Sequence, residues 1–344
     1  MGKKSDNERA LLAAVTADPE DDIVRLAYAD WLDERGDARS ADRAAFIRAQ
    51  IEAEGDLDAL SAWERVDEED RRFWADSERR KYGYSPPTAR VGRRKPRPVP
   101  PTAFDRGQEL LGRYEDEWLK PFAKWLQRYN ESPSYENMES NFRRGFPHRF
   151  TVPAESFRKH GAKFFGLAPV RELWFPGGRW FPAGSEYARL AEVPALARLR
   201  SLDLRDNAIA PGESFEAYEK MLLSPHLAGL RVLTLEGPVE GGPGFGGLRA
   251  LLGRHHLTNL ETLVFSSQTS EDFVRAFASS AKFPKLTRLE VYFCDIGPET
   301  AHVLATAPGL AALRMLDLRN CSIPPRAKRA LEERFGAGVR FRKV

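Results

Sequence analysis

A short pattern of leucines recurs along the second half of the chain and constrains its fold more than any other feature. Its clearest copy, Leu196–Ile209, reads LARLRSLDLRDNAI. Leu202 and Leu204 alternate with polar residues, which is the period of a strand with one buried face. Asn207 follows where the chain must turn away, and its side chain can bond backbone groups there. The first strand leucine recurs at Leu173, Leu202, Leu233, Leu263, Leu289 and Leu316, in steps of 26 to 31 residues.

The pattern L-x-x-L-x-L-x-x-N/C-x-L resembles that of leucine-rich repeats, and repeats of this length resemble the ribonuclease-inhibitor-like type. The resemblance implies an α/β fold, in which a solenoid has a curved parallel sheet inside and helices outside. We expect one helix per repeat, over residues 155–166, 185–193, 213–224, 245–254, 270–281 and 298–307. A helix over 325–335 and a strand over 339–341 should complete the array, and a strand over 146–152 should precede it.

Several helices are predicted before the repeats begin. The first three cover residues 7–17, 18–36 and 39–54, another covers 57–80, and residues 104–129 are helical with a kink or a new helix at Pro121. Asp18 is the predicted N-cap of the second helix, because Asp is favoured at N-caps and the proline that follows is favoured at the first helical position. Ile23, Ala27 and Trp31 recur every four residues and predict its apolar face. In the third helix, the face is predicted to carry Ala44, Ile47 and Ile51.

Two stretches of this helical region carry a second resemblance. Arg25–Asp37 reads RLAYADWLDERGD and Arg43–Gln50 reads RAAFIRAQ. Together they resemble the bacterial repeat-companion domain, a small helical module that often precedes leucine-rich repeats. The resemblance implies no catalytic activity. Tyr28 and Trp31 lie on or beside the apolar face, so we expect them to pack in the core.

These observations predict three parts of the chain. Residues 1–56 form the helical repeat-companion domain, and residues 146–344 form the leucine-rich-repeat domain. Residues 57–145 lie between them and contain a basic, proline-rich loop at 79–101. An apolar stripe in this middle part is expected to cap the first repeat. Its members are Leu111, Tyr114, Trp118, Phe122, Trp125 and Tyr129.

Charge is distributed unevenly along the chain. Residues 1–76 contain 21 Asp and Glu and 11 Lys and Arg, a net charge of −10, although the whole chain has +3. Residues 79–97 contain eight Lys and Arg and no acid. Such a segment is either a solvated insertion or a contact for phosphate backbones. Nucleic acid is therefore the alternative partner, through Arg90, Arg93, Arg94, Lys95 and Arg97.

The strand pattern also predicts which side chains leave the core. Residues that alternate with the leucines face the concave side of the sheet. One predicted column is Trp174, Asp203, Thr234, Val264, Glu290 and Asp317, and the next is Pro176, Arg205, Glu236, Ser266, Tyr292 and Arg319. Exposed Trp, Tyr and Arg are frequent anchors of protein interfaces. We therefore predict partner binding at Trp174, Asp203, Arg205, Glu290, Tyr292, Asp317 and Arg319.

The sequence shows no pattern typical of an active site. Its six histidines lack metal-ligand spacing, and no nucleophile elbow is present. Gly242–Gly247 matches a dinucleotide-binding fingerprint only formally, because it lies inside a repeat array. Cys294 and Cys321 occupy the turn position of neighbouring repeats and should stack as buried, unreactive residues. No cofactor, metal or small-molecule substrate is predicted.

Two cysteines and the absence of a signal-like or membrane-spanning stretch predict a cytoplasmic protein without contact to a membrane. The interpretation that accounts for most of the sequence is a non-catalytic scaffold or adaptor. It would bind a protein partner through the concave face, as a subunit of a larger bacterial assembly. The alternative is a nucleic-acid-associated accessory subunit that uses the basic loop at residues 79–97.

Overall fold

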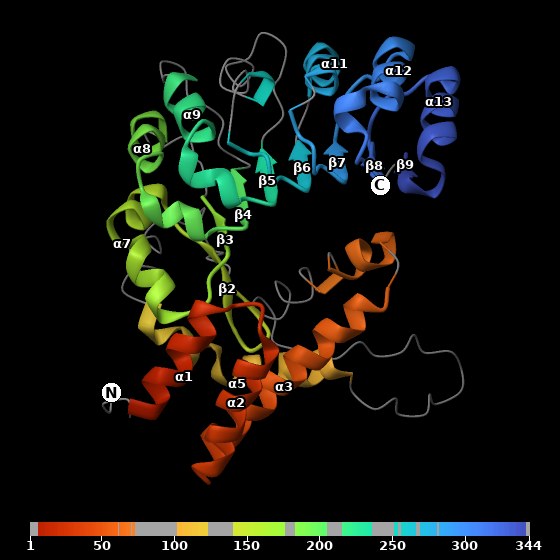
Figure 1. The fold of residues 1–344 in the computed structure, drawn as a ribbon. Coiled ribbons are helices and arrows are strands. Elements are labelled where there is room, and N and C mark those ends of the chain that lie inside the picture. Colours follow the sequence, from red (N-terminus) through yellow and green to blue (C-terminus); the bar gives the residue numbers. More distant parts are fainter. Residues whose placement is uncertain are drawn as a thin grey trace, which may run out of the picture. The chain divides into compact units, whose positions relative to one another are not determined.

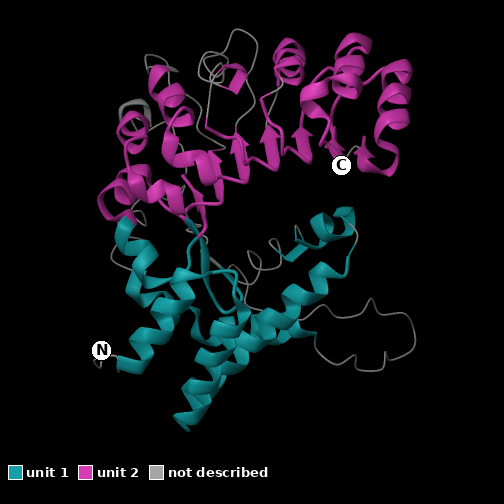
Figure 2. Ribbon diagram, viewed as in Figure 1, with its two compact units in different colours: residues 1–150, 162–170 teal, residues 151–161, 171–344 magenta. Residues whose placement is uncertain are grey.

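The computed structural model describes most of the chain. The described residues are 6–60, 62–69, 71–72, 102–122, 140–175, 183–204, 215–235, 251–253, 256–265, 269–280 and 282–341. They form two compact units, shown in different colours in Figure 2. The first unit comprises residues 1–150 and 162–170, and the second comprises residues 151–161 and 171–344.

The first unit is mainly helical. Its helices include α1 (Asp6–Ala17), α2 (Asp22–Glu34), α3 (Ala38–Asp58), α5 (Ala103–Leu119) and the 3₁₀ turn η1 (Lys120–Phe122). Residues 62–69 and 71–72, within the helix predicted over 57–80, are helical too. The predicted cap of α2 is wrong, because Asp21 and not Asp18 accepts a bond from Ile23 N, at 2.8 Å. Asp37 caps α3 in the same way, through Ser40 N at 2.9 Å.

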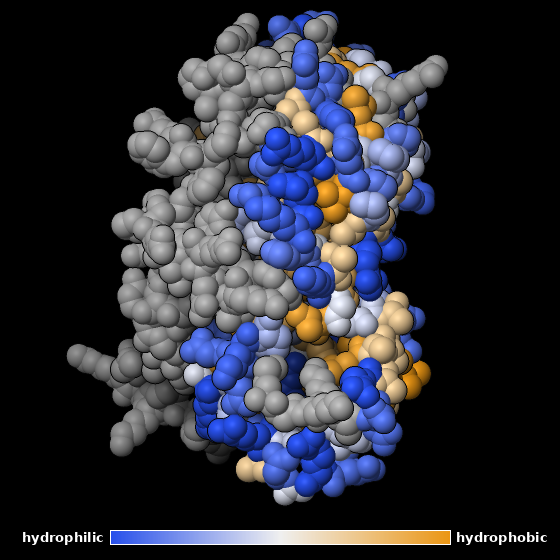
Figure 3. Space-filling model, turned by 90° about the vertical axis from the view of Figure 1, so that its left-hand side faces the viewer, coloured by the Kyte–Doolittle hydropathy of each residue, from blue (hydrophilic) through white to orange (hydrophobic). Residues whose placement is uncertain are grey.

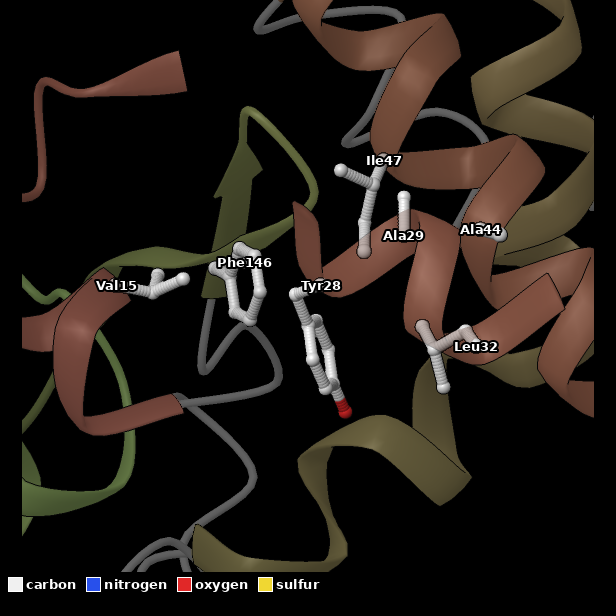
Figure 4. Packing of buried hydrophobic residues seen from close by; sticks show 7 residues of the cluster. All are labelled: Val15, Tyr28, Ala29, Leu32, Ala44, Ile47 and Phe146. Carbon is white, nitrogen blue, oxygen red and sulfur yellow. The ribbon is translucent and has the colours of Figure 1, made fainter. Parts of the chain in front are cut away.

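Figure 4 shows the core of this helical module. Its buried residues are Val15, Tyr28, Ala29, Leu32, Ala44, Ile47 and Phe146. The core role predicted for Tyr28 is confirmed, and Trp31 stacks on its ring at 5.7 Å. The predicted apolar face of α2 is wrong at Ile23, which is 77% exposed, and at Ala27, which is exposed too. Ile23 lies about 140° around the helix from Tyr28, and Arg25 is buried on the core side instead.

A β-hairpin completes the first core. Strands β1 (Ser140–Arg143) and β2 (Phe146–Thr151) pair antiparallel across a turn at Gly145. Gly145 has φ +85°, and a Cβ there would lie 2.5 Å from Ile47 Cγ1. Its N–H donates to Gln50 Oε1 at 3.0 Å. Glycine at this turn therefore permits both the left-handed backbone and the close approach of the hairpin to α3.

The aromatic stripe of α5 packs on α3. The rings of Trp118 and Phe46 lie 4.6 Å apart, and Tyr114 Oη donates to Asp42 at 2.5 Å. Phe122 packs against Phe150 of β2 at 4.8 Å. Trp125 and Tyr129, the last members of the predicted stripe, lie outside the described residues.

The second unit alternates strands and helices, as Figure 1 shows. Its strands are β3 (Glu172–Trp174), β4 (Ser201–Leu204), β5 (Val232–Leu235), β6 (Thr262–Phe265), β7 (Arg288–Val291), β8 (Met315–Asp317) and β9 (Val339–Arg340). Its helices include α8 (Ala183–Leu190), α9 (Phe215–Leu222), α11 (Glu271–Ser279), α12 (Pro298–Thr306) and α13 (Pro325–Phe335), and α7 (Ala154–Leu167) precedes β3. The predicted helix over 245–254 falls almost entirely outside the described residues.

The nine strands follow the order of the chain, from β1 to β9. All pairs from β3–β4 to β8–β9 are parallel. The structure thus confirms a helical N-terminal module followed by a long parallel sheet that alternates with helices. The predicted strand leucines are register partners: Leu173, Leu202, Leu233, Leu263, Leu289 and Leu316.

These leucines form a continuous ladder in the core of the second unit. Leu202, Leu233, Leu263, Leu289 and Leu316 are fully buried, and Leu173 is 1% exposed. The adjacent core ladder is Phe175, Leu204, Leu235, Phe265, Val291 and Leu318, with no exposure at any position. Each strand therefore covers the apolar side chains of its neighbours, and no repeat of this array buries its core alone.

Truncation of the ladder should destabilise the protein strongly. Leu202→Ala and Leu316→Ala each leave a cavity among side chains that cannot close it, so we expect a loss of about 2–5 kcal/mol. Urea unfolding followed by circular dichroism measures the loss. Leu167→Ala, at a position 38% exposed, is the matched control and should change stability much less. A change below about 0.5 kcal/mol in both ladder variants would contradict the strand register.

Candidate partner-binding face

The first predicted column of face residues is present as a row of register partners. Trp174 pairs with Asp203, Asp203 with Thr234, and Thr234 with Val264. Glu290 and Asp317 continue the row on β7 and β8. The second column is described only at Tyr292 and Arg319, because Pro176, Arg205, Glu236 and Ser266 lie outside the described residues.

A third column on this face was missed by the sequence analysis. It begins each strand and consists of Glu172, Ser201, Val232, Thr262, Arg288 and Met315, all of them half-buried. The signal for it was available, because these residues stand two positions before the first predicted column. The centre of the face carries small, uncharged side chains from β5 and β6, and its charged groups gather on β7 and β8.

Three of the carboxylates predicted on this face are buried rather than exposed to a partner. Asp203 is 5% exposed, Glu290 is 4% exposed and Asp317 is fully buried. Trp174 and Tyr292, which the pattern predicts as exposed anchors, are half-buried. The alternation of strand residues fixes which side of the sheet a residue takes, but large neighbouring side chains decide how much of it reaches solvent.

Four of the predicted binding residues form one charged network on β7 and β8. Arg319 Nε lies 2.8 Å from Asp317 Oδ2, and Arg319 Nη2 donates to Tyr292 Oη at 3.1 Å. Tyr292 in turn donates its hydroxyl proton to Glu290 Oε2, and Arg288 forms an ion pair with the same carboxylate. The Arg319 guanidinium also lies 5.6 Å from the centre of the Tyr292 ring. The network holds Tyr292 and Arg319 in fixed positions.

Burial sets the electrostatics of this network. It raises the pKa of Asp317, and the bonds from Arg319 oppose the increase. Burial also raises the pKa of Tyr292, and the charges of Glu290 and Asp317 add to the effect. Burial alone would lower the pKa of Arg319, but the bonds to Asp317 and Tyr292 raise it. Tyr292 therefore stays protonated and Arg319 stays charged at neutral pH.

The turn after β7 carries an exposed aromatic residue that the sequence analysis did not single out. Phe293 has φ +55° and is 54% exposed. Asn320 occupies the same place after β8, with φ +62°. Asparagine tolerates this left-handed conformation, whereas a bulky residue rarely adopts it. Phe293 directly follows Tyr292 in the chain, and its exposed apolar side chain stands at a backbone position that a phenylalanine seldom takes.

The two cysteines lie in neighbouring turns, as predicted. Cys294 N donates to Cys321 Sγ at 3.4 Å, and Cys321 Sγ donates to Val291 O at 3.2 Å. Cys294 is buried, but Cys321 is half-buried and less covered than predicted. Burial raises the pKa of the Cys294 thiol to about 12 and that of Cys321 to about 11. Both are therefore almost entirely thiols at neutral pH.

The structure does not test the predicted nucleic-acid contacts, which therefore stay predictions. Arg90, Arg93, Arg94, Lys95 and Arg97 lie outside the described residues. Within the described part of the chain, no group of three or more His, Cys, Asp or Glu side chains is placed to hold a metal ion. Among the described helices, none is both long and apolar enough to cross a membrane.

Among the described residues on the face that Figure 3 shows, hydrophilic ones predominate, and hydrophobic ones form smaller patches between them. Among the described residues, the exposed large hydrophobic side chains are Ile23, Leu60, Leu167 and Phe293. Of these four, Phe293 is the one that stands next to a residue of the charged network, Tyr292, in the chain. No family model matches this sequence. No curated protein matches it either.

Removal of Arg319 should destabilise the protein in a pH-dependent way. Arg319→Ala leaves Asp317 buried without its partner, and we expect a loss of about 3–5 kcal/mol at neutral pH. The pKa of Asp317, already raised by burial, should rise further in this variant. Stability lost above that pKa is regained as the pH falls through it, because protonation removes the unpaired charge.

The measurement is urea unfolding of both proteins at about pH 7 and about pH 4.5. The difference between them should shrink at the lower pH. Arg329→Ala, at an exposed position of α13, removes the same charge and should show neither effect. An equal loss at both pH values would contradict the pairing of Arg319 with an ionised Asp317.

The cysteines should resist a bulky thiol reagent in the folded protein. Their raised pKa values keep the thiolate fraction small, and only the thiolate attacks the reagent. Labelling with a dansyl maleimide should be slow without denaturant and rapid after unfolding. Ser322→Cys, which adds a thiol at an exposed position of the same turn, provides a rapidly labelled control. Equally rapid labelling of the native cysteines would contradict their positions.

Proposed function

We propose that this protein is a non-catalytic interaction scaffold that binds a partner protein through the sheet face of its second unit. In this proposal, the parallel sheet belongs to a leucine-rich-repeat solenoid and the helical module is a repeat-companion domain. The observation that carries the proposal is the network of Tyr292, Arg319, Glu290 and Asp317. It fixes two side chains of the types that most often anchor interfaces.

The physical reason is preorganisation. A flexible Tyr or Arg loses side-chain freedom when a partner binds, and this loss reduces affinity. Tyr292 and Arg319 are already held by two buried carboxylates, so most of that loss is incurred on folding. The exposed ring of Phe293 lies next to them in the chain and supplies apolar area. A rigid aromatic and cationic patch with an apolar edge is suited to a protein surface.

The centre of the proposed face offers a sharp test. Val264 lies there, half-buried, between register partners Thr234 and Glu290. Val264→Arg adds bulk and charge where a partner would lie, so it should weaken binding at least about tenfold. Val303→Arg on α12 makes the same change at another half-buried position and should leave affinity within about twofold.

The experiment uses the full chain as bait in an extract of its native host, followed by titration of the recovered protein. Circular dichroism first establishes that both variants are folded. A partner that binds the unmodified protein and Val303→Arg but not Val264→Arg supports the proposal. Equal weakening by both variants, or equal affinity for both, would assign the partner to another surface.

A further inference from the structure

A basic strip runs along the edge of the sheet where the strands begin. Its first row consists of the residues directly before strands β3 to β8: Arg171, Arg200, Arg231, Glu261, Thr287 and Arg314. Consecutive members are joined by backbone bonds, such as Arg200 N to Arg171 O at 2.8 Å and Arg231 N to Arg200 O at 2.8 Å. The row therefore advances by one strand spacing, about 4.8 Å, per repeat.

The segments that lead into the strands add more positive charge to this edge. They are residues 194–200, 225–231, 256–261, 282–287 and 308–314. Together with Arg171, they carry seven Lys and Arg but a single acid, Glu261, whereas the whole chain has 53 Lys and Arg and 50 Asp and Glu. The seven cations are Arg171, Arg198, Arg200, Arg231, Lys282, Lys285 and Arg314. Five of them are exposed, and Arg171 and Arg200 are half-buried.

Backbone carbonyls hold three of these guanidinium groups in place. Arg171 Nη1 donates to Arg198 O at 2.7 Å, Arg200 Nη1 to Gly229 O at 3.1 Å, and Arg314 Nη1 to Ala311 O at 2.8 Å. Each acceptor belongs to, or directly follows, the 3₁₀ turn before the next strand or before the arginine's own strand. A neutral carbonyl orients a guanidinium but does not cancel its charge. Three of the seven cations are therefore held in position, and a fourth, Arg231, lies 3.7 Å from Glu261, the one acid of the strip.

The composition of the strip favours a phosphate backbone over a protein as its partner. None of the exposed large hydrophobic side chains among the described residues lies on it. Protein interfaces usually combine Arg anchors with Trp or Tyr, neither of which occurs on the strip, whereas binding to nucleic acid is dominated by Lys and Arg on phosphates. His226 and His256 occupy equivalent places on the strip, one residue before a buried leucine, and His256 is exposed. Histidine rings can stack on the unpaired bases of a single strand.

We propose that this strip binds single-stranded nucleic acid, with its cations on consecutive phosphates and the two histidines beside the bases. Five strand spacings give a length of about 24 Å. This length suits a segment of several nucleotides, within the range of about 4–16 that one binding domain covers. The surface is separate from the sheet face proposed for the protein partner, so either proposal can fail without the other.

The test is fluorescence anisotropy of the full chain with a labelled 20-nucleotide RNA of mixed sequence, over a range of salt concentrations. The strip variant combines Arg231→Gln, Lys282→Gln and Lys285→Gln. Removing three phosphate contacts should weaken binding at least tenfold at moderate salt. It should also reduce the slope of log K against log salt by about 2, since each contact contributes about 0.7 for a single strand.

The matched control combines Arg326→Gln, Lys328→Gln and Arg329→Gln on α13. These positions are exposed, and the variant has the same net charge as the strip variant. The basic segment at residues 79–97 is unchanged in both variants. The control should bind within twofold of the unmodified protein. The proposal is overturned if the unmodified chain does not bind the RNA at low salt, if both variants lose affinity equally, or if a polyglutamate peptide of the same charge binds as tightly.

Discussion

The ladder of strand leucines is the interaction on which the second unit depends. Each of these leucines is a register partner of the next, and the members from Leu202 to Leu316 have no exposure to solvent. The apolar area that one strand buries is covered by its neighbours, so the stabilising free energy belongs to pairs of repeats rather than to single ones. The same register fixes every other column of the sheet, because strand side chains alternate strictly between its two sides.

The sheet face also buries charged side chains, and each of these needs a partner. Asp317 is fully buried, and desolvation of a carboxylate costs several kcal/mol unless a partner offsets it. Arg319 provides that partner from two residues further along the chain, and it also bonds Tyr292 on the neighbouring repeat. The network thus joins two consecutive repeats through polar groups, where the ladder joins them through apolar ones. A face so fixed binds with little loss of side-chain freedom.

The sequence was sufficient for those parts of the structure that depend on period alone. The strand register, the described helices between strands and the bounds of α13 all followed from spacing. It was insufficient where tertiary packing decides. Ile23 has the right spacing for a core residue, but α2 turns Tyr28 and Arg25 inward instead. Likewise, alternation placed Glu290 and Asp317 on the face but contained no information about the side chains that cover them. Phe293 escaped notice because backbone conformation, not residue type, makes it unusual.

One periodic backbone can support two surfaces of different chemistry. In the network of the proposed protein-binding face, two carboxylates and two guanidinium groups neutralise one another, and discrimination would come from shape and from fixed donors and acceptors. On the proposed nucleic-acid strip, seven cations stand against one acid, and affinity would come from charge and fall steeply with salt. The same strand register places both sets of residues. A slip of one residue would therefore move the face residues into the core and displace the cations from the strip. By holding the strand register, the leucine ladder therefore also keeps the residues of both surfaces in place.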